Sequence, residues 1–168
     1  MSKTQLKKEL KAMDADQMRE LILDLYAARP EAKAYFDFFL DPDVDKLTDR
    51  AKAAVNKELG RIKRGMLSAR FSVIRKALKD YESFGPGADH VLRLMLDTLA
   101  RAVAAERLYY AKPAFVNGTA RLALDTLKYG DKHLLFDQAV EGVRQQLPLA
   151  TFILRGPLKE ALAQFGIQ

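Results

Sequence analysis

The chain has 168 residues, of which 49% are hydrophobic, and its formal net charge is +6. A chain of this length buries about 70% of its unfolded surface, so we predict one helical domain over residues 1–168. Because the chain has no cysteine, disulfides, thiolate zinc sites, iron–sulfur clusters and cysteine nucleophiles are excluded.

Apolar residues recur at helical spacing along almost the whole chain. Met18, Leu21, Ile22 and Leu25 show this spacing most clearly, and we expect them to form one buried helix face. Helices are predicted at 2–11, 32–40, 44–59 and 88–109. One further helix should be capped by Asp14 or Asp16, and another by Ser68. Three more should follow Pro113, Gly130-Asp131 and Gly156-Pro157.

The sequence also makes predictions for three shorter segments. The stretch 61–67, with Gly65, is predicted to be an ordered loop, and Asn117-Gly118 weakens the helix that contains it. The apolar segment 149–154 is expected to be buried. No alternating pattern is long enough to predict a strand.

These patterns define the fold class. We predict an all-α protein with about seven to nine helices in antiparallel hairpins. The hairpins close into a bundle or stack as a short irregular α-α array, and the sequence does not choose between the two.

The N-terminal ten residues alternate charged with apolar residues, and no apolar leader segment follows. No window approaches the roughly 18 consecutive apolar residues of a membrane span. We therefore expect a cytoplasmic protein that does not associate with a membrane.

No arrangement of side chains indicates catalysis. His90 and His133, the two histidines, are far apart and have no metal-binding spacing. The serines lie in no nucleophile elbow, and no glycine-rich loop follows a strand. We expect no catalytic residue, no metal and no cofactor.

Glu106 is an exception because it falls within the apolar arc of its helix. A carboxylate there must find a partner, since an unpaired buried charge is unfavourable. It could form a pocket with Tyr109 or Tyr110. We favour the alternative, in which the helix end frays and Glu106 meets an arginine or solvent.

The aromatic run Tyr35-Phe36-Asp37-Phe38-Phe39 is expected to supply core residues. Phe38 is displaced from the other aromatic residues on the helix. It is therefore the one member of the run that we expect to be available for an exposed contact.

Positive charge is concentrated between residues 50 and 79, which hold ten basic residues and a single acid, Glu58. Such a segment is typical of a polyanion-binding surface, although an uneven solvated surface has the same composition. Phe71 and Tyr81 lie on the core side, so exposed aromatics for base stacking are not interleaved. The candidate polyanion-binding residues are Arg61, Lys63, Arg64, Arg75, Lys76 and Lys79.

The first part of the chain resembles a known family. The segments Glu20-Leu21-Ile22-Leu23-Asp24-Leu25-Tyr26, Lys33–Pro42 and Leu67-Ser68-Ala69-Arg70, followed by Lys76–Tyr81, occur in the order seen in the uncharacterised bacterial family called domain of unknown function 6155. The resemblance covers about residues 1–100. It implies a helical bacterial cytoplasmic protein and supplies no activity or site.

Two functions follow as hypotheses. Many amphipathic helices without a catalytic arrangement favour a non-enzymatic helical domain that binds a protein partner. The alternative is nucleic-acid or other polyanion binding through the basic segment 50–79. The sequence does not define the oligomeric state.

Overall fold

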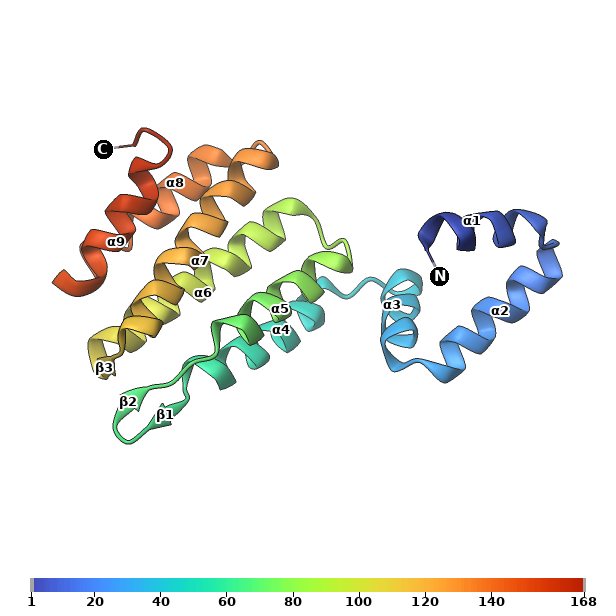
Figure 1. Cartoon of the computed structure of the whole chain (residues 1–168), viewed down its shortest axis with the longest axis horizontal. Coiled ribbons are helices and arrows are strands. Elements are labelled where there is room, and N and C mark those ends of the chain that lie inside the picture. Colours follow the sequence, from blue (N-terminus) through green and yellow to red (C-terminus); the bar gives the residue numbers. More distant parts are fainter. Residues whose placement is uncertain (1, 168) are drawn as a thin grey trace. The chain divides into compact units, whose positions relative to one another are not determined.

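A computed structural model describes residues 2–167, which form nine helices and three short strands (Figure 1). The all-α prediction is confirmed. The chain forms two compact units, unit 1 at residues 1–43 and unit 2 at residues 44–168. The prediction that 1–168 behaves as one domain stays a prediction.

Unit 1 contains three helices whose starts are marked by polar caps or proline. Asp14 caps the second helix with a reciprocal capping box with Gln17, and Pro30 occupies the first turn of the third. The helices are α1 (Lys3–Ala12), α2 (Ala15–Ala28) and α3 (Pro30–Leu40).

Unit 2 holds the remaining elements in three layers. Helices α6 and α7 form the middle layer, with α4 and α5 on one side and α8 and α9 on the other (Figure 1). This stacking of successive helix pairs is that of an α-α array. The helices are α4 (Val44–Leu59), α5 (Phe71–Ser83), α6 (Ala88–Leu108), α7 (Pro113–Lys132), α8 (Phe136–Arg144) and α9 (Phe152–Ala163).

The core of unit 2 is formed where these layers meet. Leu99 of α6, Leu122 and Leu127 of α7 and Leu154 and Leu158 of α9 are completely buried. Gly118 lies within α7, which continues through Asn117-Gly118, and a Cβ added to it would come within 2.3 Å of the Phe71 ring. The glycine therefore allows α5 and α7 to approach closely.

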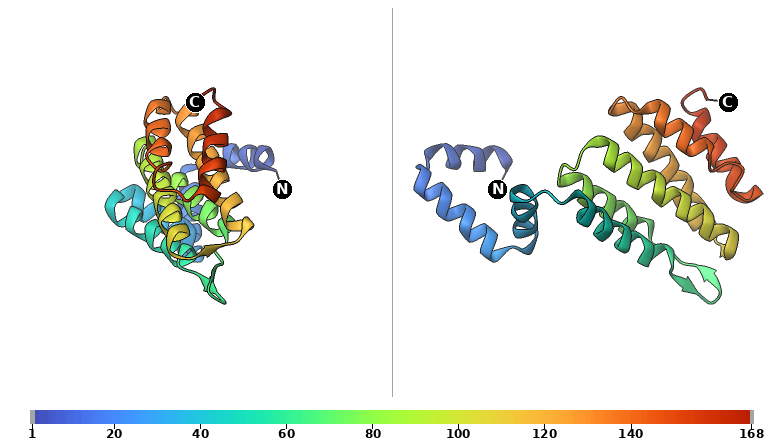
Figure 2. Two further views of the ribbon diagram at one scale, coloured as in Figure 1. Left: turned by 90° about the vertical axis from the view of Figure 1, so that its left-hand side faces the viewer. Right: turned by 180° about the vertical axis from the view of Figure 1, so that it is seen from behind.

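A small sheet replaces the loop predicted at 61–67. β1 (Ile62–Lys63) and β2 (Met66–Leu67) form an antiparallel hairpin, and β3 (Tyr110–Ala111) pairs in parallel with β2. Figure 2 shows the hairpin projecting beyond the ends of α4 and α5. The expectation of no strand is wrong because two-residue strands are too short to show alternation.

The predictions for the C-terminal region also need correction. Leu149 and Ile153 are about half exposed and Phe152 is 85% exposed, so segment 149–154 is not buried throughout. Helix α9 begins at Phe152, before Pro157, and continues through that proline. Leu154 and Leu158 lie on the same face on either side of Pro157, and their burial offsets the missing backbone donor.

The fifth helix begins later than predicted. Ser68 does not cap it, because α5 starts at Phe71 and Arg70 occupies the N-cap position without a side-chain hydrogen bond. Residues 66–67 are held in β2 and the Ser68 amide donates to the Arg61 carbonyl at 2.8 Å. The strand pairing therefore delays the start of the helix.

Candidate functional site

The first candidate surface is the apolar side of unit 1. No residue in α1, α2 or α3 is buried. Met18, Leu21, Ile22 and Leu25, which we call the α2 stripe, are each 37–46% exposed. The exposed large apolar residues of unit 1 are Leu6, Met18, Leu21, Ile22, Leu23, Leu25, Tyr35, Phe39 and Leu40.

Tyr26 holds α2 and α3 together without using the α2 stripe. Its hydroxyl donates to Asp37 at 2.7 Å, and this hydrogen bond to a carboxylate raises the pKa of Tyr26. The Phe36 ring lies 6.4 Å from the Tyr26 ring, and the Lys33 ammonium lies 5.4 Å from its centre. The contacts between the two helices therefore leave the stripe exposed.

Two predictions about unit 1 are wrong. The α2 stripe was expected to be a buried face, but α3, the one helix of unit 1 in extensive contact with α2, does not cover it. Phe38 was expected to be the exposed aromatic, yet it is half-buried while Phe39 is 68% exposed. Helical spacing identified the amphipathic helix correctly, and it could not show whether a neighbour covers the apolar face.

The second candidate surface is the basic segment, and its central acid is Glu58. The Glu58 carboxylate is buried, and the Arg70 guanidinium donates to both of its oxygens, from Nε at 3.0 Å and from Nη2 at 2.5 Å. Arg61 adds a longer contact at 3.7 Å. The hydrogen bonds from Arg70 lower the pKa of Glu58 to about 2. This clamp fixes both ends of the β1–β2 hairpin.

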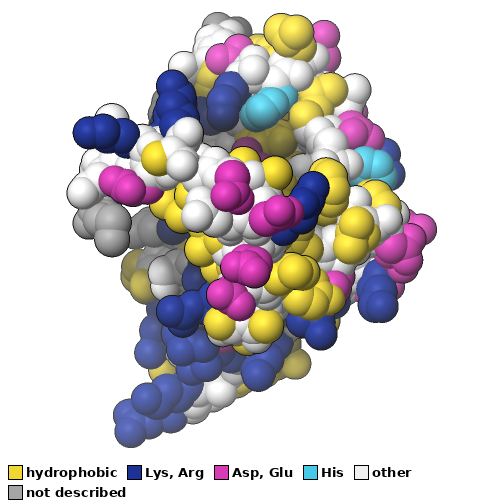
Figure 3. All heavy atoms as spheres, turned by 90° about the vertical axis from the view of Figure 1, so that its right-hand side faces the viewer, with side chains coloured by type: hydrophobic (Ala, Val, Ile, Leu, Met, Phe, Trp, Pro, Cys, Tyr) yellow, Lys and Arg dark blue, Asp and Glu magenta, His cyan; other side chains and the backbone are white. Residues whose placement is uncertain are grey.

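The hairpin presents two unpaired cations. Its turn residues are Arg64 and Gly65, with φ of 54° and 74°, as in the type I′ turn that matches strand twist. Lys63 and Arg64 are exposed and make no ion pair within residues 2–167. Dark blue Lys and Arg side chains gather over this end of unit 2, at the bottom of Figure 3.

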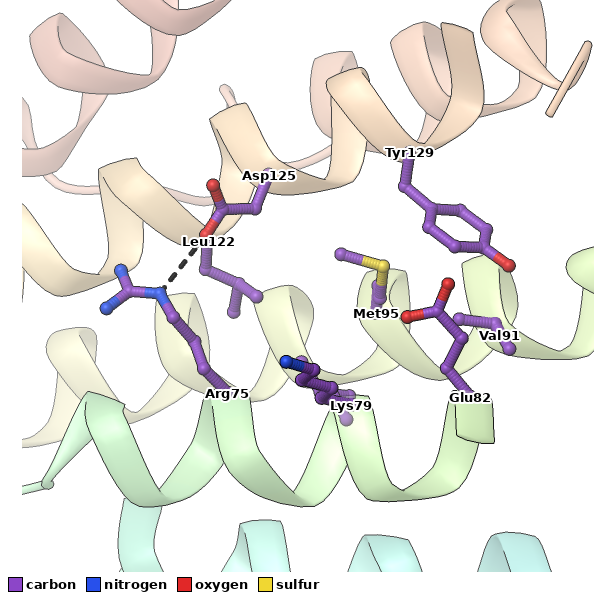
Figure 4. Close-up of a pocket in the computed structure, with 9 residues that line it drawn as sticks. Arg75, Lys79, Glu82, Val91, Met95, Leu122, Asp125 and Tyr129 are labelled. Carbon is purple, nitrogen blue, oxygen red and sulfur yellow. Dashed lines mark hydrogen bonds and ion pairs between the residues drawn. The ribbon is translucent and has the colours of Figure 1, made fainter. Parts of the chain in front are cut away.

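The cations of α5 lie elsewhere and are mostly paired. Arg75 donates to Asp125 of α7 at 3.1 Å, and Lys76 pairs with Asp80 of its own helix. Arg75 and Lys79 line a cavity of about 260 Å³ between α5, α6 and α7, floored by apolar residues such as Met95 (Figure 4). Lys79 has no ion-pair partner among the described residues.

The six predicted polyanion-binding residues therefore fall into two groups. Arg61, Lys63 and Arg64 lie on or beside the hairpin, and the other three lie along α5. Arg61, Arg75 and Lys76 are in ion pairs, which reduces the charge that they offer to a ligand. The pairing of Arg75 could not be anticipated, because Asp125 is fifty residues further along the chain.

Other residues near the hairpin were not among the predicted polyanion-binding residues. The pairing of β3 with β2 brings Tyr110 into the sheet, and Arg107, Tyr109 and Lys112 lie within three residues of it in the chain. All four are exposed. Tyr110 is 67% exposed and Tyr109 44%. The only signal for them was the pair of adjacent tyrosines just before Lys112-Pro113.

Glu106 is buried, and neither expectation for it holds. Helix α6 stays regular to Leu108, and the Glu106 carboxylate accepts hydrogen bonds from the hydroxyl and, at 3.4 Å, the backbone amide of Thr151. Thr151 is the residue before α9, whose positive helix end favours a carboxylate. Glu106 therefore links α6 to α9 and has a structural explanation.

Each histidine contacts a residue near it in the sequence. His133 stacks on Tyr129 with ring centres 4.2 Å apart, and His90 lies 3.7 Å from the carboxylate of Asp89. Within residues 2–167, no group of three or more acidic or histidine side chains is placed to hold a metal. No helix of the described chain is long and apolar enough to cross a membrane.

Comparison with known proteins identifies the family of this chain. The model of the family of unknown function DUF6155 matches residues 1–117, and the chain belongs to that family. The match extends beyond the predicted residue 100, to include β3 and the beginning of α7. No curated protein and no solved structure matches the chain.

Proposed function

We propose that this member of a family without a known function is a non-enzymatic helical domain that binds a protein partner. One observation carries the proposal: three amphipathic helices in unit 1 leave their apolar side chains exposed. The α2 stripe places four of these side chains on one helix face, and exposed apolar patches mark interaction sites in soluble proteins. A partner that presents an amphipathic helix would complete the missing core.

The α2 stripe and its own helix provide the test. Leu21→Ser with Leu25→Ser removes apolar surface from the stripe, whereas Leu23→Ser removes it from the opposite face, where Leu23 is 65% exposed. Tagged full-length chains are purified from their native host lysate, and recovered proteins are quantified against the unaltered chain. The partner is then purified and binding is measured with the isolated components.

We expect the double variant to lose at least about tenfold in affinity, since two central apolar anchors are removed. The Leu23→Ser control should bind as the unaltered chain does. Equal binding by all three chains, or equal loss in the control, would contradict the proposal.

A second candidate function is polyanion binding through the basic segment. It is supported by the exposed and unpaired cations Lys63, Arg64 and Lys79. Electrostatic binding of this kind weakens steeply with salt. Affinity for heparin should therefore fall as salt rises, and Lys63→Ala with Arg64→Gly should reduce it, while Arg19→Ala in unit 1 should not.

A further inference from the structure

The three-stranded sheet joins tyrosines to the basic hairpin. Register aligns Lys63 of β1 with Met66 of β2, and Met66 with Tyr110 of β3. Residues paired across neighbouring strands point to the same face, and strands lie roughly 4.8 Å apart. Lys63 and Tyr110 therefore flank Met66 on one face, with backbones separated by roughly two strand spacings.

The surroundings of this row are basic and apolar rather than acidic. Arg64 lies in the turn next to Lys63, and Arg107 and Lys112 flank the two tyrosines on either side in the chain. None of these four cations has an ion-pair partner in the described part of the chain. Glu106, the nearest acid in sequence, is buried against Thr151. The charge of this surface is thus free to meet a ligand.

The turn between β1 and β2 also indicates that the charge of this surface binds a ligand. Arg64 has φ of 54°, a conformation that costs a residue with a Cβ about 1 kcal/mol relative to glycine. Asparagine or glycine would fit a type I′ turn with less strain. The chain instead places a guanidinium at the tip of the projecting hairpin, where it is exposed.

We propose that this sheet surface binds single-stranded nucleic acid. Cations that contact successive phosphates and exposed aromatic rings on which bases stack are the two parts of such a site. Tyr110 supplies the ring on this face, and Lys63, Arg64, Arg107 and Lys112 supply the charge. Stacking requires unpaired bases, so a duplex would use the charges alone. The inference rests on the polyanion-binding candidate function and specifies its ligand.

The test compares a labelled oligo-dT of about 20 nucleotides, the matching DNA duplex and heparin, by fluorescence anisotropy over a salt series with the full chain. Tyr110→Ala should weaken oligo-dT binding about tenfold, since a stacked base contributes strongly. Heparin binding should change by less than about twofold, because the cations are unaltered. Tyr35→Ala, at an exposed tyrosine of unit 1, is the matched control and should change neither.

Charge and stacking are separated by a second variant. Lys63→Ala with Arg64→Gly should weaken binding of both ligands and reduce the salt slope for oligo-dT by about 1.4, or about 0.7 for each phosphate that is no longer neutralised. The chain has no tryptophan, so tyrosine emission is observable. Quenching of that emission by oligo-dT in the unaltered chain tests stacking even where a variant does not fold.

The outcomes distinguish the two levels of the proposal. Binding of oligo-dT with quenching, and its loss in the tyrosine variant, supports the inference. Three results overturn the inference and leave polyanion binding in place. They are binding of heparin without oligo-dT, equal binding of oligo-dT and the duplex, and equal binding of oligo-dT by the tyrosine variant and the unaltered chain. No binding of any of these ligands at low salt overturns both.

Discussion

Units 1 and 2 are built from the same kind of amphipathic helix and differ in what covers the apolar faces. In unit 2, Leu99 of α6 is completely buried because helices lie on both sides of the middle layer. In unit 1, Leu21 of α2 is 41% exposed, and α3 is the one helix of that unit in extensive contact with α2. A helical pattern therefore predicts an apolar face reliably, whereas burial depends on how many neighbours the chain supplies.

The largest expected effect tests this difference directly. Leu99→Ala should destabilise the chain by about 2–5 kcal/mol, because it removes a completely buried side chain and leaves a cavity. Leu21→Ala should cost less than about 1 kcal/mol, since the side chain is already partly hydrated. Urea unfolding, with hydrogen exchange to assign each unit, measures both. Equal costs would mean that the α2 stripe is covered in solution.

A second substitution examines how closely unit 2 is packed. Gly118→Ala should destabilise by about 1–3 kcal/mol, because the new methyl group meets the Phe71 ring. Alanine ordinarily favours a helix over glycine by about 1 kcal/mol, so helix propensity alone predicts the opposite sign. Ala27→Val, at an exposed position of α2, should destabilise by only about 0.6 kcal/mol, which is its difference in helix propensity. A stabilised Gly118→Ala chain would contradict the close approach of α5 and α7.

The ion pairs of the two units should respond differently to acid. The folded chain holds the pKa of Glu58 at about 2, below its ordinary value of 4.5, through hydrogen bonds from Arg70. The stabilisation is therefore complete above pH 4.5 and is lost as pH falls from there to about 2. The melting temperature should fall across this window, and Glu58→Gln should lower it at neutral pH and flatten its dependence on pH there.

The exposed Asp16–Arg19 pair of unit 1 is the comparison for this prediction. Asp16 and Arg19 are 85% and 72% exposed, and such pairs contribute less than about 1 kcal/mol. Asp16→Asn should therefore change stability little at neutral pH. A pH profile that Glu58→Gln leaves unchanged would show that the clamp does not stabilise the fold.

The smallest effect concerns backbone strain, which occurs in unit 2. Leu134 has φ of 60° and is 94% exposed. Leu134→Gly should therefore stabilise the chain by about 1 kcal/mol, since it relieves strain and sacrifices no packing. Leu23→Gly, inside α2 of unit 1, should destabilise by about 1 kcal/mol. Thermal unfolding measures both, and a loss of stability in Leu134→Gly would contradict the argument.

Sequence reasoning located the helices because caps and breakers are local signals. Val44–Leu59 was predicted to the residue, and the predicted end of α6 was off by one. Burial was predicted less well, since Leu154 is completely buried while Phe152, two residues earlier, is 85% exposed. Such alternation depends on which helices lie beside α9, and a run of apolar letters does not contain that information.

The residues of the candidate surfaces were also predicted only in part, because the sequence does not show which distant residues lie beside them. Arg61, Lys63 and Arg64 were identified from charge alone, and β1 and β2 place them near one another. Tyr110 was considered only as a pocket partner of Glu106. Its place beside the hairpin was missed because a two-residue strand pairs it with Met66, which lies 44 positions earlier. The charge that Arg75 offers to a ligand was overestimated, because its ion-pair partner Asp125 comes from a distant helix. The surroundings of Tyr110 and Arg75 therefore depend on contacts between residues far apart in the sequence.

The parallel pairing of β2 with β3 also has a consequence for the order of folding. A hairpin such as β1–β2 closes locally within about 1–10 µs, because its strands are adjacent in sequence. β3 pairs later, since the chain must first close the much longer loop that contains α5 and α6. The tyrosines therefore reach the basic hairpin late, and a nascent chain that displays the charges does not yet have the aromatic half of the surface.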